Sequence, residues 1–215
     1  MMDLSGKFIV LEGGDGVGKT TQARMLADRL KENGESVLFT REPGGCPEAE
    51  AIRSILFPDY RWLSHYGLSW TPATEVLLHT AARIEHVRKT IGPALDRGEC
   101  VICDRYHWST IAYQCAGNGI PTSLVSALRE QVPLLCPDIV IVIDAPVDVL
   151  GNRITFRGSG NRYDGESKPF RERVRQSFLD QHRFSPWYSA VINGDQDERS
   201  VHRDVINELT KWKER

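Results

Sequence analysis

Short apolar runs alternate along the chain with longer segments in which apolar residues recur every three or four positions. Uninterrupted apolar runs are typical of strands covered on both faces, and the three-to-four spacing is typical of helices that pack on one side. The runs that predict strands occupy residues 8–11, 37–39, 100–103, 139–143 and 187–192. The segments that predict helices occupy residues 19–33, 47–57, 72–97, 109–116, 123–135, 147–156, 168–183 and 198–211.

This alternation predicts an α/β fold of three layers, with a parallel five-stranded sheet flanked by helices. Right-handed crossovers place the loops that follow the strands along one edge of such a sheet, where ligands bind. The 215 residues contain no internal repeat and no long linker, so we expect a single domain over residues 1–215.

The first predicted strand, FIVLE, runs into a glycine-rich loop that opens the first helix. Residues 13–20 read GGDGVGKT and fit the pattern G-x-x-x-x-G-K-[ST], in the strand–loop–helix context that a phosphate-binding loop requires. Glycines let backbone N–H groups converge on phosphate oxygens, and the helix N-terminus adds positive potential. We expect Lys19 to reach the outer phosphates and Thr20 to bind Mg²⁺. The residues expected to bind the nucleotide in this loop are Gly13, Gly14, Asp15, Gly16, Val17, Gly18, Lys19, Thr20 and Thr21.

Charged residues follow two other predicted strands at the edge where ligands would lie. Asp104 and Arg105 come directly after the third strand, and Arg41 follows the second. An aspartate in this place can hold Mg²⁺ or its water shell, and arginine grips a phosphate with its planar fork. The alternatives are a helix N-cap for Asp104, a surface salt bridge for Arg105 and a solvated turn for Arg41.

The predicted helix over residues 72–97 carries His79 and Arg83 four positions apart, so the two side chains share one face. A flat ring beside a guanidinium can hold a nucleobase by stacking and by hydrogen bonding. Taken without further context, a surface histidine and a solvated arginine are the simpler interpretation.

Composition narrows the class of partner. The chain is 40% hydrophobic and 26% charged, and its formal net charge is -2, so neither nucleic acid nor a membrane surface is expected as the main partner. No apolar run approaches the ~20 residues that cross a bilayer, and the first residues lack a secretory signal pattern. We therefore expect a cytoplasmic protein. Cys100 and Cys103 would point to opposite faces of one strand, which favours buried thiols over a shared metal or disulfide.

Residues 153–168 lie between two predicted helices and are rich in glycine, serine and arginine. This composition predicts a mobile segment inside the domain, not a boundary between domains.

Five motifs, in this order along the chain, resemble those of a known family: FIVLEGGDGVGKTTQ, TREPGG, LLHTAAR, DRYHWSTIAYQ and RGSGNRYD. Together they resemble thymidylate kinase from about residue 8 to the C-terminus, and the pairing of TREPGG with D-R-Y-x-x-S-T-x-A-Y-Q is specific to that family. The resemblance implies a P-loop kinase fold with a small LID segment at about residues 153–168. It also implies a homodimer that phosphorylates dTMP to dTDP, in dTTP synthesis, with ATP and Mg²⁺.

The resemblance implies roles for individual residues as well. Lys19 and Thr20 would serve ATP and Mg²⁺, while Asp15 would contact the acceptor's 3′-hydroxyl and the metal shell. Arg41 and Arg105 would hold the acceptor phosphate. The residues expected around the nucleoside are His79, Arg83, Ser109, Thr110, Tyr113 and Gln114.

Two arginines of the LID complete the implied site. Arg157 would lie against adenine, and Arg162 would swing in toward the transferred phosphate. The catalytic set implied by the resemblance is therefore Lys19, Arg41, Arg105 and Arg162. Gly16 stands where some eukaryotic members carry an arginine. The LID arginines are therefore expected to supply the positive charge that this arginine would give, as in the bacterial type of the family.

Position 79 departs from the family, whose members usually carry a phenylalanine that stacks on the base. Histidine can also stack, but it is smaller and polar and titrates near neutral pH. A kinase for dUMP or for a modified pyrimidine deoxynucleoside monophosphate is therefore the alternative to dTMP.

Other classes of P-loop protein fit less well. A GTPase-like switch usually carries Asn-Lys-x-Asp, and no Asn-Lys pair occurs in the chain. A nucleoside kinase would leave Arg105 without its phosphate. A catalytically inactive scaffold would have no use for Lys19, Thr20 and Asp104 together.

Overall fold

The computed structural model describes residues 3–57, 69–132, 134–157, 163 and 165–214; for residues 152 and 154–157 it describes the backbone alone. Five strands form one sheet, and every strand pair in it is parallel. The strands are β1 (Phe8–Glu12), β2 (Val37–Arg41), β3 (Cys100–Asp104), β4 (Ile139–Asp144) and β5 (Ser189–Asn193). The predicted α/β class and all five predicted strands are confirmed.

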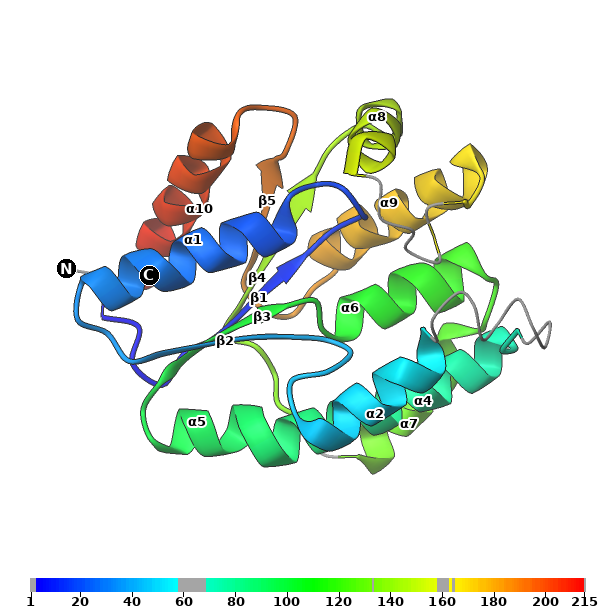
Figure 1. The fold of residues 1–215 in the computed structure, drawn as a ribbon, viewed down its shortest axis with the longest axis horizontal. Helices are drawn as coiled ribbons and strands as arrows, with labels where there is room; N and C mark the ends of the chain where they lie inside the picture. Colours follow the sequence, from blue (N-terminus) through cyan, green and yellow to red (C-terminus); the bar gives the residue numbers. More distant parts are fainter. Residues whose placement is uncertain (1–2, 58–68, 133, 158–162, 164, 215) are drawn as a thin grey trace.

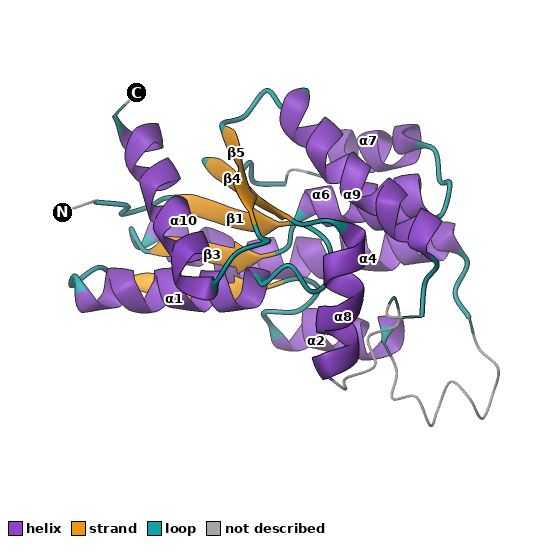
Figure 2. Cartoon of the chain, turned by 90° about the horizontal axis from the view of Figure 1, so that it is seen from above, coloured by secondary structure: helices purple, strands orange, loops and turns teal. Residues whose placement is uncertain are grey.

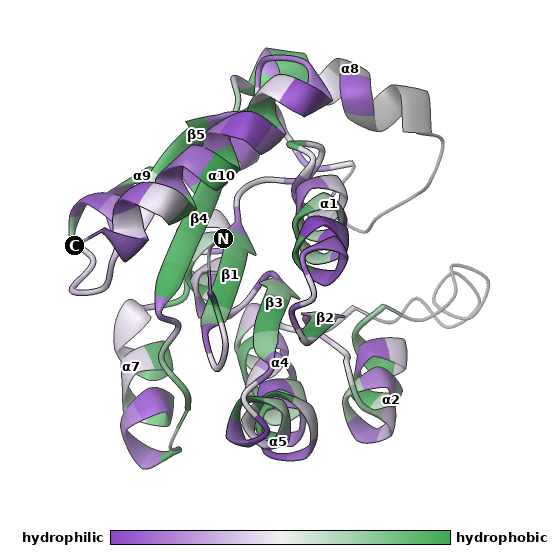
Figure 3. Cartoon of the chain, turned by 90° about the vertical axis from the view of Figure 1, so that its left-hand side faces the viewer, coloured by the Kyte–Doolittle hydropathy of each residue, from purple (hydrophilic) through white to green (hydrophobic). Residues whose placement is uncertain are grey.

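Helices cover both faces of the sheet (Figure 1). The helices in chain order are α1 (Lys19–Glu32), α2 (Pro47–Leu56), α4 (Pro72–His86), α5 (Gly92–Asp96), α6 (His107–Thr110), α7 (Thr122–Gln131), α8 (Val147–Arg157), α9 (Lys168–Arg183) and α10 (Glu198–Lys213), with π-helical segments η1 (Val87–Ile91) and η2 (Ile111–Gly117). Figure 3 shows that the strands are largely hydrophobic, whereas the helices turn hydrophilic faces outward.

The core consists of two apolar layers, one on each face of the sheet. One layer packs α1 and α10 against the sheet and includes Leu26 and Val205; the other packs η1, η2 and α9 against it and includes Ile91 and Phe178. Cys100 belongs to the first layer and Cys103 to the second, so the two thiols do lie on opposite faces. Burial raises the pKa of the Cys100 thiol to about 12 and raises that of Cys103 as well. The prediction of buried thiols at these two positions is confirmed.

The strand order is β2-β3-β1-β4-β5, so the chain moves to one side after β1 and to the other after β3. Ligands of open α/β sheets bind at such a switch point, outside the carboxyl ends of the strands. Helices α6, α8 and α9 gather beyond that end of the sheet (Figures 1 and 2). The register places Asp104 of β3 opposite Leu11 of β1 and Arg41 of β2, which sets the predicted strand-end residues beside the phosphate loop.

Two predicted helices are interrupted or shortened for a physical reason. The predicted helix over residues 72–97 continues through the π-helical turn η1 before α5, because Pro93 has no N–H to donate and its ring crowds the preceding turn. The segment predicted as 123–135 ends at Gln131, where Val132 has extended backbone angles. A residue that precedes proline, here Pro133, is disfavoured in the helical region.

Candidate active site

The phosphate loop has a conformation that requires its glycines. Gly13 has φ +135°, and a Cβ on it would lie 2.2 Å from the Ile143 carbonyl oxygen. Gly18, the N-cap of α1, has φ +96°, a region that other residues rarely adopt. Lys19 is buried and donates a hydrogen bond of 2.5 Å to the Gly14 carbonyl. The loop thus has the glycine conformation and the place at a helix N-terminus that phosphate binding requires.

The other residues of the loop divide between core and ligand side. Val17 is only 3% exposed and packs into the core, so its backbone and not its side chain faces a ligand. Thr21 is exposed on α1. Gly16 has φ +86°.

Thr20 and Asp104 lie together at the carboxyl ends of β1 and β3. The Thr20 hydroxyl donates to one oxygen of the Asp104 carboxylate. The other oxygen, Oδ1, is buried and has no hydrogen-bond partner among the described residues. A hydroxyl beside a partly unsatisfied carboxylate fits Mg²⁺ that is also bound by phosphate oxygens. No group of three or more His, Cys, Asp or Glu residues in the described ranges could hold a metal alone.

Arg105 is the centre of the acceptor side. Its guanidinium donates to the Gly13 carbonyl at 3.1 Å and to the Ser109 hydroxyl at 3.0 Å, and it pairs with Asp15. Tyr113 lies beneath it, with the guanidinium carbon 5.2 Å from the ring centroid, and donates to Asp15 at 2.7 Å. Burial alone would lower the pKa of Arg105, but Tyr113 and the carboxylates of Asp15, Asp104 and Glu12 together outweigh it and raise the pKa. The guanidinium is therefore a permanent cation beside the phosphate loop.

Asp15 belongs to this acceptor cluster. Burial alone would raise the pKa of Asp15, yet Arg105, Lys19 and Tyr113 together hold it below the ordinary value. Both of its carboxylate oxygens have protein partners, Arg105 and Tyr113. The carboxylate is thus ionised and faces the acceptor side; its predicted contact with the metal shell stays a prediction.

Arg83 is a second cation, 3% exposed, at the ligand edge. It donates to the Glu42 carboxylate at 2.6 Å, and to the Tyr106 carbonyl and the Thr110 hydroxyl at 3.1 Å each. Burial alone would lower the pKa of Arg83, but Glu42, Tyr106 and Glu12 together outweigh it and raise the pKa. The structure thus brings Arg83 and Thr110 together, as the prediction for the base pocket requires.

Glu42 lies within the TREPGG run, but no sequence motif predicted a role for it. The structure shows that it orients Arg83 and also contacts the buried His86, whose ring lies 3.3 Å from the other Glu42 oxygen and 2.7 Å from the Thr40 hydroxyl. The signal that could have identified Glu42 is an acidic residue inside a loop otherwise suited to anions. The Glu42–Pro43 peptide in this loop is cis.

His79 and Gln114 are two further residues that were predicted for the base pocket. His79 is half-buried one helical turn before Arg83, with its ring 6.1 Å from that of Phe57 in an edge-on contact. Gln114 is buried on η2 and donates to the Tyr163 hydroxyl at 2.9 Å and to Glu75 at 3.3 Å. Stacking of His79 on a base stays a prediction.

Arg41 lies farther from the centre of the site than Arg105 and Arg83. Its side chain is 47% exposed and pairs with Glu50 of α2 at 3.1 Å. A neighbouring residue that the sequence argument missed, Arg53, donates to the Pro43 carbonyl at 2.9 Å and is half-buried. Burial lowers the pKa of Arg53, as do the cations of Arg41 and Arg105. Three arginines therefore lie close enough for their charges to interact, with the carboxylates of Glu50 and Asp104 beside them.

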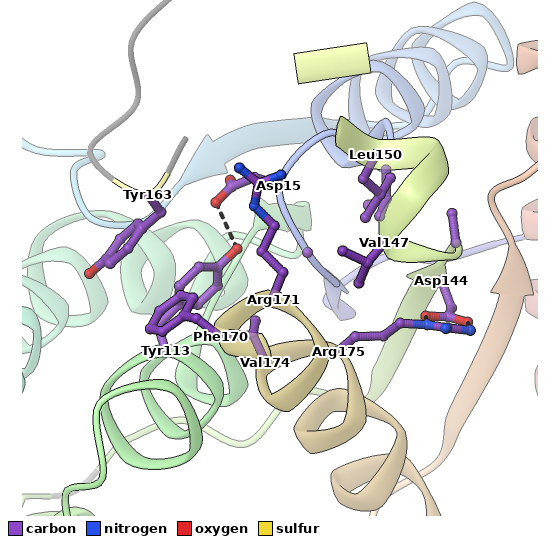
Figure 4. Close-up of a pocket in the computed structure, with 13 residues that line it drawn as sticks. Asp15, Tyr113, Asp144, Val147, Leu150, Tyr163, Phe170, Arg171, Val174 and Arg175 are labelled. Atoms are coloured by element: carbon purple, nitrogen blue, oxygen red, sulfur yellow. Dashed lines mark hydrogen bonds and ion pairs between the residues drawn. The ribbon is translucent and has the colours of Figure 1, made fainter. Parts of the chain in front are cut away.

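A pocket opens beside the phosphate loop, between α8 and α9 (Figure 4). Asp15 and Tyr113 line one side of it, and Val147 and Leu150 of α8 line the other. At its far end Arg175 donates two hydrogen bonds of 2.8 Å to Asp144, which ties α9 to the end of β4. The pocket therefore lies at the base of the segment predicted as the LID.

The contacts above include neither of the two predicted LID arginines, because the structure does not describe their side chains. Arg162 lies outside the described residues, and of Arg157 the structure describes only the backbone, at the end of α8. Residues 153–157 of the predicted LID belong to α8, and Lys168 begins α9.

Fold and site together define a class of protein. A P-loop stands at the switch point of a parallel sheet, and Arg105 contacts it at Gly13 and Asp15. A switch protein needs only the first of these features, whereas a kinase for a phosphorylated acceptor needs both. The fold and the site are those of a P-loop phosphotransferase.

Comparisons with known proteins identify the family within that class. The family model described as thymidylate kinase matches residues 11–205. A thymidylate kinase of Caulobacter vibrioides is 44% identical over 91% of this chain and 92% of its own length, and one of Dinoroseobacter shibae is 42% identical over 97% and 99%. The crystal structure of thymidylate kinase from Ehrlichia chaffeensis superimposes with a TM-score of 0.75 at 36% identity, covering 96% of this chain and 99% of that one. The chain belongs to the thymidylate kinase family, which confirms the resemblance and the P-loop kinase fold.

No helix in the described ranges is long and apolar enough to span a membrane.

Proposed function

We propose that the protein transfers the γ-phosphoryl group of ATP to dTMP, giving ADP and dTDP for dTTP synthesis. The observation that carries this proposal is the position of Arg105. Its guanidinium contacts the phosphate loop at Gly13 and Asp15, and the segment after β3 at Ser109. One permanent cation can therefore touch both the donor and the acceptor phosphate. The family membership supports dTMP over dUMP or a modified pyrimidine nucleotide.

The transfer needs alignment and charge neutralisation more than a base. An acceptor phosphate oxygen, already ionised at neutral pH, attacks the γ-phosphorus in line, and the bond to the β-phosphate oxygen breaks. Lys19 would hold the outer phosphates of ATP, while Arg105, with Arg41 and Arg53, would hold the acceptor phosphate. Mg²⁺, which Thr20 and Asp104 would hold, supplies neutralisation of phosphate charge when bound.

The nucleoside of the acceptor would lie between α4 and η2. Arg83 and Thr110 would hydrogen-bond the thymine edge, His79 would stack on its face, and Gln114 would close the pocket. Tyr113 would press on the sugar and Asp15 would bind its 3′-hydroxyl. Arg157 against adenine and Arg162 at the transferred phosphate belong to the same proposal.

The proposal also includes a homodimer that works in the cytoplasm with small-molecule substrates, not nucleic acid or a membrane. What supports this part is the family resemblance together with the modest net charge of -2.

An acceptor panel tests the proposed function. ATP and Mg²⁺ are supplied with dTMP, dUMP, dCMP or thymidine, and ADP and the phosphorylated product are measured. We expect dTDP formation with the highest kcat/KM for dTMP, little reaction with dUMP or dCMP, and none with thymidine, because thymidine offers Arg105 no phosphate. A preference for thymidine, or ADP release that no acceptor stimulates, would contradict the proposal.

A further inference from the structure

Glu12 is a buried charged residue that the proposed mechanism does not use. It ends β1 directly before the phosphate loop and is 0% exposed. A buried carboxylate costs free energy unless hydrogen bonds replace its water. Here Oε1 accepts from the backbone N–H groups of Tyr106 at 2.9 Å and Ser109 at 3.1 Å, and Oε2 accepts from the Ser109 hydroxyl at 2.6 Å. All three donors come from the segment that follows β3.

That segment contains a strained turn. Arg105 has φ +70° and is the only non-glycine residue with positive φ among those the structure describes. Such a conformation costs on the order of 1–3 kcal/mol and persists only where the surroundings enforce it. Glu12 binds the N–H of the next residue, Tyr106, and so holds the turn directly at its exit.

The contact extends to the Arg105 side chain through one hydroxyl. Ser109 donates to Glu12 and accepts from the Arg105 guanidinium at 3.0 Å. Glu12 therefore fixes both the backbone turn that carries Arg105 and the hydroxyl that orients its guanidinium. Since Glu12 is also the last residue of β1, the same residue is joined by one peptide bond to the glycine loop.

We propose that Glu12 is a positioning residue that sets Arg105, and with it the acceptor phosphate, at a fixed distance from the phosphate loop. It touches no substrate and acts through Arg105 and Ser109. This inference rests on the proposed function, because it takes Arg105 to bind the acceptor phosphate.

Glu12→Gln tests the inference with little change of shape. The amide oxygen still accepts from the two backbone N–H groups, but the amide nitrogen cannot accept from the Ser109 hydroxyl. We expect KM for dTMP to rise about tenfold and kcat to fall about tenfold or more, because a small misplacement of a positioned group costs much of the rate. KM for ATP should change less than about twofold.

Ser109→Ala provides a second variant that removes the link without touching the buried charge. It should give the same dTMP-selective loss. The kcat/KM for dTMP of the double variant should lie within about twofold of that of the less active single variant, because both changes break one chain of contacts.

Asp138→Asn is the matched control. This carboxylate accepts from the Phe8 N–H at 2.8 Å and pairs with Lys7, so it anchors β1 at the end away from the site. We expect a lower Tm and unchanged KM values for both substrates.

The possible results separate the two proposals. If Glu12→Gln only lowers Tm, as Asp138→Asn should, or raises both KM values equally, the positioning role is wrong. If Arg105→Ala leaves dTMP binding intact, the assignment of Arg105 in the proposed function fails instead. Loss of dTMP binding in Arg105→Ala together with wild-type kinetics in Glu12→Gln would overturn the positioning role alone.

Discussion

Single residues of this site have chemical properties that follow from their burial. Lys19 is the clearest case, because its ammonium group is buried beside another cation. Burial and Arg105 lower its pKa to about 8 against the opposing effect of Asp104, Asp15 and Glu12. In the free protein, the lysine therefore loses its charge as the pH rises through about 8.

This shift predicts a pH dependence for ATP use. We expect kcat/KM for ATP to fall above about pH 8, approaching tenfold per pH unit, because kcat/KM reports ionisation in the free enzyme. A bound triphosphate stabilises the ammonium form, so the fall in kcat should begin at higher pH. Steady-state kinetics between about pH 6.5 and 9.5 measure the pH at which kcat/KM falls and the pH at which kcat falls.

Lys19→Arg is the control for this prediction, because a guanidinium keeps its charge throughout that range. The residual kcat/KM for ATP of this variant should not fall above about pH 8. A wild-type profile that stays flat beyond pH 9 would show that Lys19 keeps its proton and that burial has less effect than expected.

The residue types at the site were largely readable from the chain, but their partners were not. Lys19, Thr20, Asp104 and Arg105 could be predicted because motif and strand end fix their place. The contacts of Glu42, Glu12 and Arg53 could not, because they are made with residues from other parts of the chain. A one-dimensional pattern contains no signal for which buried carboxylate meets which guanidinium.

At the scale of elements, the loop between β2 and α2 lies between the arginines proposed to hold the acceptor phosphate and the residues proposed to hold its base. Its Gly45 has φ +89°, and a Cβ there would lie 2.3 Å from His86 Nε2 and 2.6 Å from the Thr40 hydroxyl oxygen. His86 in turn contacts Glu42, which orients Arg83. The contact of Gly45 with His86 therefore links this loop to α4 and, through Glu42, to Arg83.

Gly45→Ala should disturb this contact. The added methyl would displace His86 and loosen Glu42, so we expect a loss of about 2–4 kcal/mol in the free energy of unfolding and a several-fold rise in KM for dTMP. Denaturant titration and dTMP kinetics measure the two effects.

Gly98→Ala is its matched control, since Gly98 has φ +78° and nothing within 4 Å of the added carbon. It should show only the backbone cost, about 1–2 kcal/mol, with KM for dTMP unchanged. Equal behaviour of the two variants would mean that the His86 contact has no influence on the acceptor.

Element boundaries were predicted less well than element types. The helix predicted over residues 109–116 begins at His107 and becomes the π-helix η2 from Ile111. Arg173 of α9 donates to the carbonyls of Ala116 and Gly117 at its end. Such a wider turn at a functional site depends on tertiary contacts, which apolar spacing does not encode.

At the scale of the whole molecule, the order of strands brings distant segments to one place. The phosphate loop follows β1, Glu42 follows β2 and Arg105 follows β3, and these are three adjacent parallel strands. The alternation of strands and helices predicted the parallel sheet, and the rule on switch points then predicted the edge where the residues meet. The strand order itself was not readable from periodicity, because it depends on which crossovers pack best.

The central claim is that the donor and acceptor phosphates meet at Arg105. Adenosine and thymidine joined through their 5′-oxygens by five phosphates would occupy both sites at once, and calorimetry on the full chain with Mg²⁺ measures the affinity. We predict a Kd at least ~100-fold below those of ATP and dTMP, because linkage makes the second contact intramolecular. Adenosine pentaphosphate, which lacks thymidine, should not show this gain. A linked compound that binds no more tightly than adenosine pentaphosphate would contradict the claim that the two sites adjoin.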